Sequence, residues 1–173
     1  NVTVENTQIQ DFTYGFWLNS SSGNSISENN ATNNSYGIWL ISSSDNIIGE
    51  NNLTANGGHG VYLSSSSNDS INGNNIEKSV SGVYLSSSSS NNSISGNNLT
   101  NNAYGFSLYS SSNNSVSGNN ITLTGYDGIA LYSSSSNNSI GGNIIVNGFS
   151  GVLLDNSSSS NIVSENTIAN NNI

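Results

Sequence analysis

The apolar residues of this chain recur with a long, fixed period. A Gly–apolar–x–Leu pattern returns every 22 or 23 residues, so the chain can be aligned on its glycines into columns of equivalent positions. The anchoring glycines are Gly15, Gly37, Gly60, Gly82, Gly105, Gly128 and Gly151. The two apolar residues of each unit stand two positions apart, which is the period of a β-strand with one buried face. The sequence therefore predicts one strand-containing unit repeated along its length.

Four columns of aliphatic residues follow from this alignment. The first holds Phe16, Ile38, Val61, Val83, Phe106, Ile129 and Val152, and the second holds Leu18, Leu40, Leu63, Leu85, Leu108, Leu131 and Leu154. The third holds Val4, Ile26, Ile48, Ile71, Ile94, Val116, Ile140 and Val163, and the fourth holds Ile9, Ala31, Leu53, Ile76, Leu99, Ile121, Ile145 and Ile168. Short β-branched runs between Asn, Ser and Gly turns favour strands over helices. Stacked columns at this period predict an all-β fold, a right-handed single-stranded parallel β-helix (solenoid) of about seven coils.

Asparagine also occupies fixed columns. One runs through Asn29, Asn51, Asn74, Asn97, Asn119, Asn143 and Asn166, and another through Asn24, Asn46, Asp69, Asn92, Asn114, Asn138 and Asn161. Asparagine tolerates a left-handed backbone, and its amide can bond to the equivalent amide one coil away, at about 4.8 Å. We expect both columns to form structural ladders at the corners of the coils.

The composition is extreme, because Ser and Asn make up more than two fifths of the chain. Such polar sequence is ordinarily disordered, but the regular apolar columns argue against disorder here. A net charge of −9, with Lys78 as the one basic side chain and no Arg, excludes nucleic-acid binding. No run of 18 apolar residues exists, so no membrane insertion of this segment is expected. Residues 1–173 are expected to form a single β-helix domain, as a processed form or a segment of a longer chain.

Two units carry a family resemblance. The segments GVYLSSSSSNNSISGNNLTNN (82–102) and GFSLYSSSNNSVSGNNITLT (105–124) resemble the parallel β-helix repeats of the NosD-like family, and the likeness covers nearly the whole chain. The Ser/Asn-rich form is most similar to modules of prokaryotic cell-surface proteins, which implies an extracellular or cell-surface location. The family's copper association needs imidazole or sulfur ligands. Because the chain has no Met, no Cys and only His59, this role is not expected to carry over.

Few residues are suited to catalysis or to metal binding. Enzymes of this fold that cleave polysaccharides need clustered carboxylates, usually with Arg or Lys nearby. Glu28 and Glu50 occupy equivalent positions on consecutive coils, which predicts a separation of about 5 Å. Two solvated side chains are the preferred interpretation; a Ca²⁺ site and a retaining-type acid pair are the alternatives. We therefore expect no cofactor, with Ca²⁺ at this pair as the exception.

An outward column of aromatic residues is the main candidate contact surface. It consists of Trp17, Trp39, Tyr62 and Tyr84, and it continues as Ser107, Ala130 and Leu153. Three interpretations stay open: cross-coil stacking that stabilises the sheet, contact with another protein chain, and contact with a glycan. A second aromatic column, Tyr14, Tyr36, His59 and Tyr104, precedes the glycines and is expected to pack at a corner. His59 is interpreted there as a substitute for Tyr and not as a ligand.

Asn-x-Ser/Thr sequons are frequent. The glycosylation candidates are Asn30, Asn52, Asn68, Asn91, Asn98, Asn113, Asn120 and Asn137. The abundance of Asn, Ser and Thr accounts for their number by chance, so the count alone does not establish glycosylation.

Together these features predict an extracellular structural or adhesive module without catalytic activity, in a surface layer, filament or spacer. Its expected partners are copies of itself or other surface proteins, with glycans as a further class. The alternative is a carbohydrate-binding or carbohydrate-acting β-helix that uses the outward aromatic strip.

Overall fold

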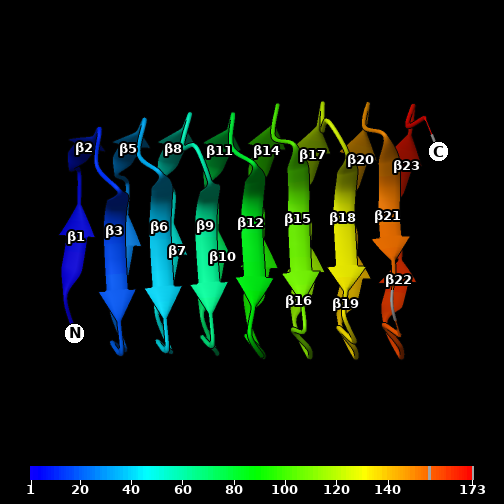
Figure 1. The fold of residues 1–173 in the computed structure, drawn as a ribbon, viewed down its shortest axis with the longest axis horizontal. Coiled ribbons are helices and arrows are strands. Elements are labelled where there is room, and N and C mark those ends of the chain that lie inside the picture. The colour runs from blue at the N-terminus through cyan, green and yellow to red at the C-terminus, as the bar shows by residue number, and fades with distance from the viewer. Residues whose placement is uncertain (156, 173) are drawn as a thin grey trace.

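The computed structural model describes residues 1–155 and 157–172, and all their regular secondary structure is β-strand. Successive strands are distributed in turn over three parallel sheets, which we call sheets A, B and C (Figure 1). Sheet A contains β1 (Thr3–Glu5), β4 (Ser25–Ser27), β7 (Ile47–Gly49), β10 (Ser70–Asn72), β13 (Ser93–Ser95), β16 (Ser115–Ser117), β19 (Ser139–Gly141) and β22 (Ile162–Ser164). Sheet B contains β2 (Gln8–Gln10), β5 (Asn30–Thr32), β8 (Asn52–Thr54), β11 (Asn75–Glu77), β14 (Asn98–Thr100), β17 (Asn120–Thr122), β20 (Ile144–Val146) and β23 (Thr167–Ala169). Sheet C contains the longer strands β3 (Tyr14–Asn19), β6 (Tyr36–Ile41), β9 (His59–Ser64), β12 (Ser81–Ser86), β15 (Tyr104–Tyr109), β18 (Asp127–Tyr132) and β21 (Ser150–Leu154).

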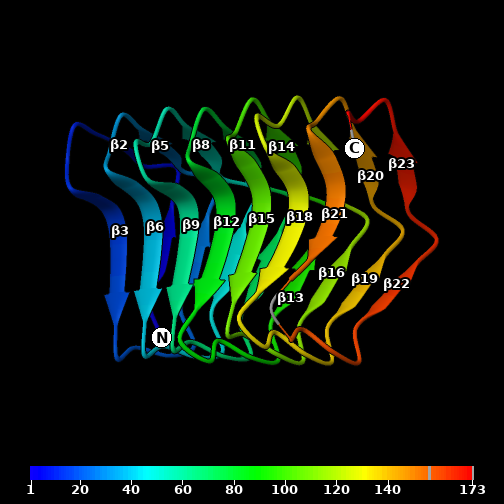
Figure 2. The ribbon, with the colours of Figure 1, turned by 45° about the vertical axis from the view of Figure 1, so that its right-hand side comes forward.

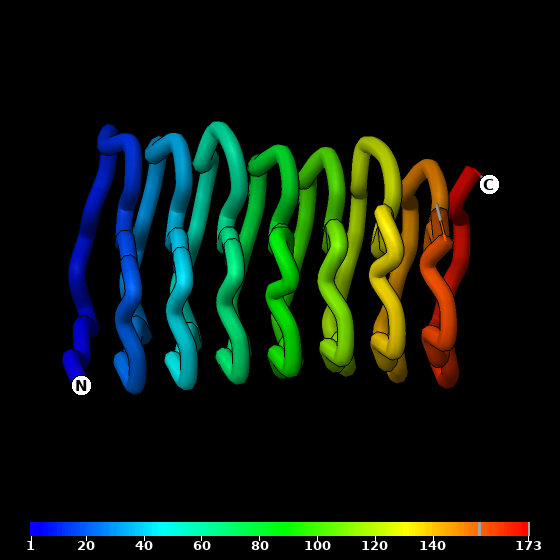
Figure 3. The backbone as a smooth tube through the Cα atoms, turned by 60° about the horizontal axis from the view of Figure 1, so that its bottom comes forward, coloured from blue at the N-terminus to red at the C-terminus, as the bar shows by residue number. Residues whose placement is uncertain are grey.

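The coils stack in sequence order into a right-handed rod with the two termini at opposite ends (Figures 1 and 3). Sheet C forms one broad face, and the strands of sheets A and B run behind it (Figures 1 and 2). Every strand pairs in parallel with the equivalent strand of the next coil. This architecture confirms the predicted parallel β-helix. The described residues contain no helix of the length and apolarity needed to cross a membrane.

The predicted aliphatic columns form the core. Pairing places Val83 opposite Val61 and Leu85 opposite Leu63 in sheet C, and Ile71 opposite Ile48 in sheet A. Side chains of the inner coils are fully buried, whereas Val163 and Ile168 in the last coil are 41% and 47% exposed. Residues in a terminal coil have a neighbouring coil on one side only, so part of their apolar surface stays uncovered.

The two asparagine ladders are present, but the left-handed backbone lies one residue earlier than expected. Asn51 shows the pattern: its Nδ2 donates to Asn74 Oδ1 (2.9 Å) and to the backbone oxygen of Ile26 (2.8 Å). The residue before it, Glu50, has φ +56°, whereas Asn51 itself is buried. The left-handed residue turns the chain outward, and the asparagine that follows points inward and satisfies the corner's buried backbone groups.

Two further ladders were not predicted. The corner between sheets B and C has its own, in which Asn34 Nδ2 donates to Asn56 Oδ1 (3.2 Å). In the serine-rich turn, buried hydroxyls accept from backbone amides one coil earlier, as Ser66 Oγ does from the Ser43 nitrogen (3.1 Å). The corners and the serine-rich turn of the coil are therefore held by polar side chains inside the rod.

One anchor glycine illustrates why sheet C starts as it does. A Cβ on Gly82 would lie 2.9 Å from the backbone oxygen of Gly105 and 3.1 Å from Cγ of Leu99. The glycine is thus required by the close approach of backbone to backbone and of sheet C to sheet B.

Candidate functional site

The outer face of sheet C carries the two aromatic columns side by side. Pairing in this sheet skips the anchor glycine: Tyr14 faces Tyr36, and the next pairs are Phe16 with Ile38 and Trp17 with Trp39. The rings of Tyr14 and Trp17 consequently meet on one surface, with centroids 5.3 Å apart. The expectation that the Tyr14 column packs separately at a corner was wrong for this part of the surface, because the chain changes its alternation at the glycine.

Within this surface the rings stack mainly on one another. Trp39 and Tyr62 are stacked at 5.2 Å with 13° between their planes, and Trp17 and Trp39 are stacked at 6.4 Å with 29°. Offset stacking of this kind is favourable and covers much of the ring faces. The rings of the first three coils therefore turn much of their flat surface toward each other, which supports the interpretation that stacking stabilises the sheet.

Near the middle of the rod a small residue interrupts one aromatic column, and another small residue ends the aromatic part of the other, which continues as Ala130 and Leu153. Ser81 follows His59 in one column, and Ser107 follows Tyr84 in the other. Both serines are buried, at 2% and 4% exposure. A shallow groove of about 530 Å³ lies over them. Its lining consists of Tyr36, His59, Tyr62, Val80, Ser81, Tyr84, Tyr104, Ser107, Tyr109 and Tyr132, and we call it the aromatic groove.

The aromatic groove is the place where ring surface remains open to a ligand. On one side Tyr84 ends the stacked series, since its coil neighbour is Ser107. On the other side stand Tyr104, which is stacked on Tyr126 at 5.1 Å, and Tyr109, which is 46% exposed. The candidate site thus has aromatic walls and a floor of serine, a combination suited to a ligand with both apolar faces and hydroxyl groups.

A single carboxylate supports the far wall of the groove. Asp127 is 8% exposed; its Oδ2 accepts from the Tyr132 hydroxyl (3.1 Å), and its Oδ1 accepts from the Ser150 hydroxyl. Both carboxylate oxygens are therefore engaged, and Tyr132 is held in a fixed orientation. Burial, followed by the hydrogen bond to Asp127, raises the pKa of Tyr132 above its ordinary value.

Burial keeps three further titratable groups of the groove uncharged at physiological pH. Burial raises the pKa of Tyr84, as it does that of Tyr104, so both phenols keep their protons. Burial also lowers the pKa of His59 from 6.5 to about 4, so the imidazole is uncharged. The groove consequently offers phenol and serine hydroxyls and no positive charge.

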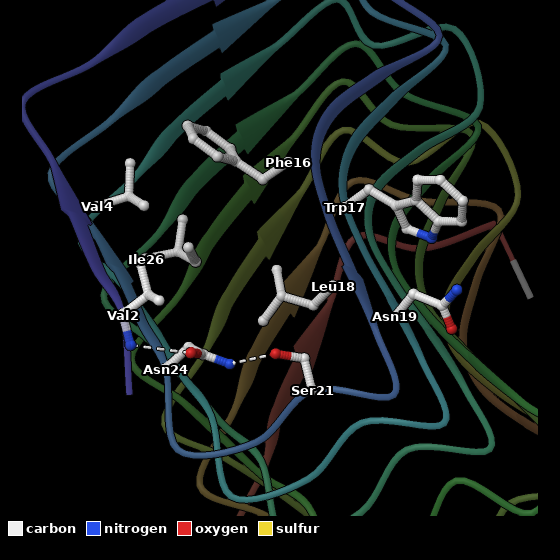
Figure 4. Close-up of a pocket in the computed structure, with 9 residues that line it drawn as sticks. All are labelled: Val2, Val4, Phe16, Trp17, Leu18, Asn19, Ser21, Asn24 and Ile26. Atoms are coloured by element: carbon white, nitrogen blue, oxygen red, sulfur yellow. Dashed lines mark hydrogen bonds between the residues drawn. The ribbon is translucent and has the colours of Figure 1, made fainter.

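A second hollow, of about 400 Å³, lies at the first coil and has a different character (Figure 4). Val4, Phe16, Leu18 and Ile26 point into it, whereas Trp17 points away toward the outer face of sheet C (Figure 4). Its rim is tied by Asn24, which accepts from the Val2 nitrogen (2.9 Å) and donates to the Ser21 hydroxyl (2.8 Å). This hollow is the end of the core columns.

Glu28 and Glu50 lie on consecutive coils at the corner between sheets A and B. Both are exposed and adopt φ +56°, and Gly73 takes the equivalent place in the next coil. In the described residues no three His, Cys, Asp or Glu side chains are grouped so as to hold a metal ion. Calcium binding by this pair stays a prediction.

The sequons fall into two structural classes. Asn68, Asn91, Asn113 and Asn137 are exposed at the corner before sheet A with φ between +56° and +59°. Asn52, Asn98 and Asn120 lie on the outer face of sheet B, where each Nδ2 donates to an asparagine one coil away. Asn30 is the acceptor at the start of that series. Glycosylation of either class stays a prediction, and the corner class has the freer amides.

A family model described as "Periplasmic copper-binding protein (NosD)" matches residues 1–122 and 89–173 of this chain. No curated protein matches the chain. A double mutant of a periplasmic alginate epimerase is 27% identical with a TM-score of 0.81, over 85% of this chain and 36% of that one. A DFA-IIIase from Arthrobacter chlorophenolicus in complex with DFA-III is 19% identical with a TM-score of 0.70, over 96% and 46%. An alginate lyase from a Paenibacillus species is 14% identical with a TM-score of 0.65, over 91% and 74%.

These neighbours correct the functional expectation from the sequence. The chain spans between 36% and 57% of the length of the epimerase and DFA-IIIase structures. The likeness to the DFA-IIIase and to the alginate lyase shows a shared fold. The epimerase shares the fold and is also more similar in sequence. The expected structural or adhesive module without catalytic activity is contradicted by the likeness to a periplasmic alginate epimerase, which is 27% identical over 85% of this chain. The carbohydrate alternative is the better supported of the two readings.

The copper named in the family description does not fit the residues present. Copper sites use imidazole, thiolate or thioether ligands, and the sequence contains one His, no Cys and no Met. The Nδ1 atom of His59 is buried without a hydrogen-bond partner, and its ring is stacked on Tyr84 at 4.5 Å. A single imidazole held in an aromatic stack provides no ligand set for copper.

Proposed function

This chain belongs to the family described as periplasmic copper-binding protein (NosD), and we propose that it is a carbohydrate-binding or carbohydrate-acting β-helix. Its saccharide lies in the aromatic groove on the outer face of sheet C. The observation that carries this proposal is that one aromatic column is interrupted at Ser81 and the aromatic part of the other ends at Ser107. This arrangement opens a groove of about 530 Å³ between phenol rings on an otherwise stacked surface.

The chemistry of the groove supports a sugar ligand. The flat faces of Tyr84 and Tyr104 provide apolar surface for the C–H groups of a pyranose or furanose ring. The hydroxyls of Tyr84, Tyr104 and Tyr109 make no hydrogen bond within the described residues, so they are available to sugar hydroxyls. A similar periplasmic alginate epimerase, matched over 85% of this chain, gives independent support for carbohydrate chemistry on this scaffold.

We further propose a location in the cell envelope or outside the cell. The descriptions of the family and of the epimerase structure both name the periplasm, which supports this location. Display on the cell surface itself is the narrower form of this proposal.

Isothermal titration with a panel of oligosaccharides tests the function. The informative variant is Ser107→Tyr, because the same column carries Trp or Tyr in four other coils and accepts a ring without disturbing the backbone. We expect the parent chain to bind at least one oligosaccharide and Ser107→Tyr to lose that binding while its circular dichroism spectrum and melting temperature persist. Phe12→Ala, which truncates a 61% exposed ring several coils away, is the matched control and should bind normally. A bound saccharide that Ser107→Tyr retains at full affinity would place the site elsewhere.

A further inference from the structure

The charge distribution around the aromatic groove narrows the class of saccharide. None of its ten lining residues is Lys or Arg. The single Lys or Arg of the sequence, Lys78, is 60% exposed at a corner, where it pairs with Glu77 at 3.4 Å. His59, the remaining basic group of the lining, is neutral. A carboxylate or sulfate bound in the groove would therefore lose water without gaining a charged partner, which is unfavourable.

The carboxyl group of Asp127 lies directly behind this wall. It is buried beside Tyr132, and the chain as a whole carries a net charge of −9. The negative potential of the whole chain repels anionic polymers and slows their approach. A polyuronate such as alginate is thus opposed both at the groove and at a distance.

A cationic sugar is not favoured in its place. Asp127 is 8% exposed, and its two oxygens already accept from Tyr132 and Ser150. An ammonium group in the groove would have no free carboxylate to pair with. What the groove does offer is the hydroxyls of Tyr84, Tyr104 and Tyr109, each able to donate one hydrogen bond to a sugar hydroxyl and to accept one from it.

We propose that the aromatic groove selects uncharged saccharide chains and rejects polyuronates, in contrast to the alginate-acting proteins that share its fold. The inference rests on the proposed carbohydrate function and specifies its ligand. Selection arises from the absence of a cation in the lining and from the negative net charge of the whole chain.

Matched polymer pairs test the inference directly. Polygalacturonate and its fully methyl-esterified form share a backbone, but only the first carries negative charge. Carboxymethyl cellulose and hydroxyethyl cellulose form a second such pair, with an acidic and an uncharged substituent on the same backbone. In affinity electrophoresis or titration calorimetry of the full chain, we expect the uncharged member of at least one pair to bind about tenfold or more tightly than its acidic partner. Added salt should reduce this preference, because it screens the repulsion.

A charge variant supplies the second arm. Ser107→Arg places a cation in the groove, and Ser107→Gln is its uncharged polar control. Relative to this control, Ser107→Arg should weaken binding of the uncharged polymer and improve binding of the acidic one. Equal or tighter binding of the acidic polymers by the parent chain would overturn the inference and leave the carbohydrate function intact. Failure to bind any member of either pair, or any oligosaccharide of the panel, would overturn both.

Discussion

The imidazole of His59 stacks on the phenol ring of Tyr84 with ring centroids 4.5 Å apart and 9° between the planes. The two residues come from adjacent coils and from different columns, so this contact joins the two columns immediately before Ser81 and Ser107. Tyr84 is thereby held as the near wall of the aromatic groove. His59 acts as a planar packing group, in agreement with its interpretation as a substitute for Tyr.

The buried imidazole makes stability depend on pH. Its pKa is lowered from 6.5 to about 4, so between these values the unfolded chain binds more protons than the folded one. This contribution to the free energy of unfolding is therefore complete above pH 6.5 and is lost as the pH falls toward 4, by roughly 2 to 3 kcal/mol. Urea denaturation of the parent and of His59→Tyr at several pH values measures it. The variant should lose this component of the pH dependence, and an unchanged profile would contradict the assignment.

Asp69 is expected to oppose His59. It occupies an asparagine ladder position, where burial raises its pKa from 3.8 to about 6; its Oδ2 is buried without a partner. The folded chain here binds more protons between pH 3.8 and 6, so this contribution is complete at low pH and is lost as the pH rises through 6.

Replacement by the residue of the neighbouring coils tests this directly. Asp69→Asn restores the Nδ2 donor that Asn46 and Asn92 use in the same ladder. At pH 7 it should raise the free energy of unfolding by about 2 kcal/mol, and its stability should increase with pH between 4 and 6.5, where the parent profile is flattened by two opposing groups. Chemical denaturation at pH 4.5 and pH 7 checks both points; a variant that is less stable than the parent at pH 7 would refute the ladder argument.

Adjacent asparagines should differ sharply in their importance. Asn97 Nδ2 donates to Ile71 O, Ser95 O and Asn119 Oδ1 inside the rod, at 2.9, 3.1 and 2.9 Å. Asn98 makes its ladder on the exposed face of sheet B. Asn97→Ala should lower the free energy of unfolding by about 3 kcal/mol, because it leaves buried groups unpaired, and Asn98→Ala by less than about 1 kcal/mol. Thermal and urea melts of this matched pair would show similar losses if the inner ladder were unimportant.

A left-handed corner offers a stabilising substitution. Leu123 adopts φ +56° with its side chain 51% exposed, whereas Asn33, Asn101 and Asn147 occupy the same corner in other coils. A leucine pays a steric penalty in this conformation that asparagine largely avoids. Leu123→Asn should therefore raise the free energy of unfolding by about 1 kcal/mol, and Asn101→Leu should lower it similarly. Melting temperatures that move in the same direction for both variants would disprove this reasoning.

The columns of the sequence were sufficient to predict the fold, because a 22- or 23-residue period records directly which residues become neighbours in space. The left-handed residue was expected at Asn51 but lies at Glu50. The conformational preference of asparagine suggested Asn51, whereas the buried hydrogen bonds of its side chain decide its place. The columns also separated Tyr14 from Trp17, since a strict alternation of faces does not include the change at Gly15. The aromatic groove itself was visible only as Ser81, which interrupts one aromatic column, and Ser107, where the aromatic part of the other column ends. This signal requires the two columns to be known as neighbours.

The positions of Ser81 and Ser107 determine where along the rod the aromatic groove lies. The interior ladders and aliphatic columns do not depend on which coil carries the two serines. The position of the proposed binding site along the rod is therefore determined by two residues of the outer face. Exchanging small and aromatic side chains between coils would move the site by one step without altering the framework.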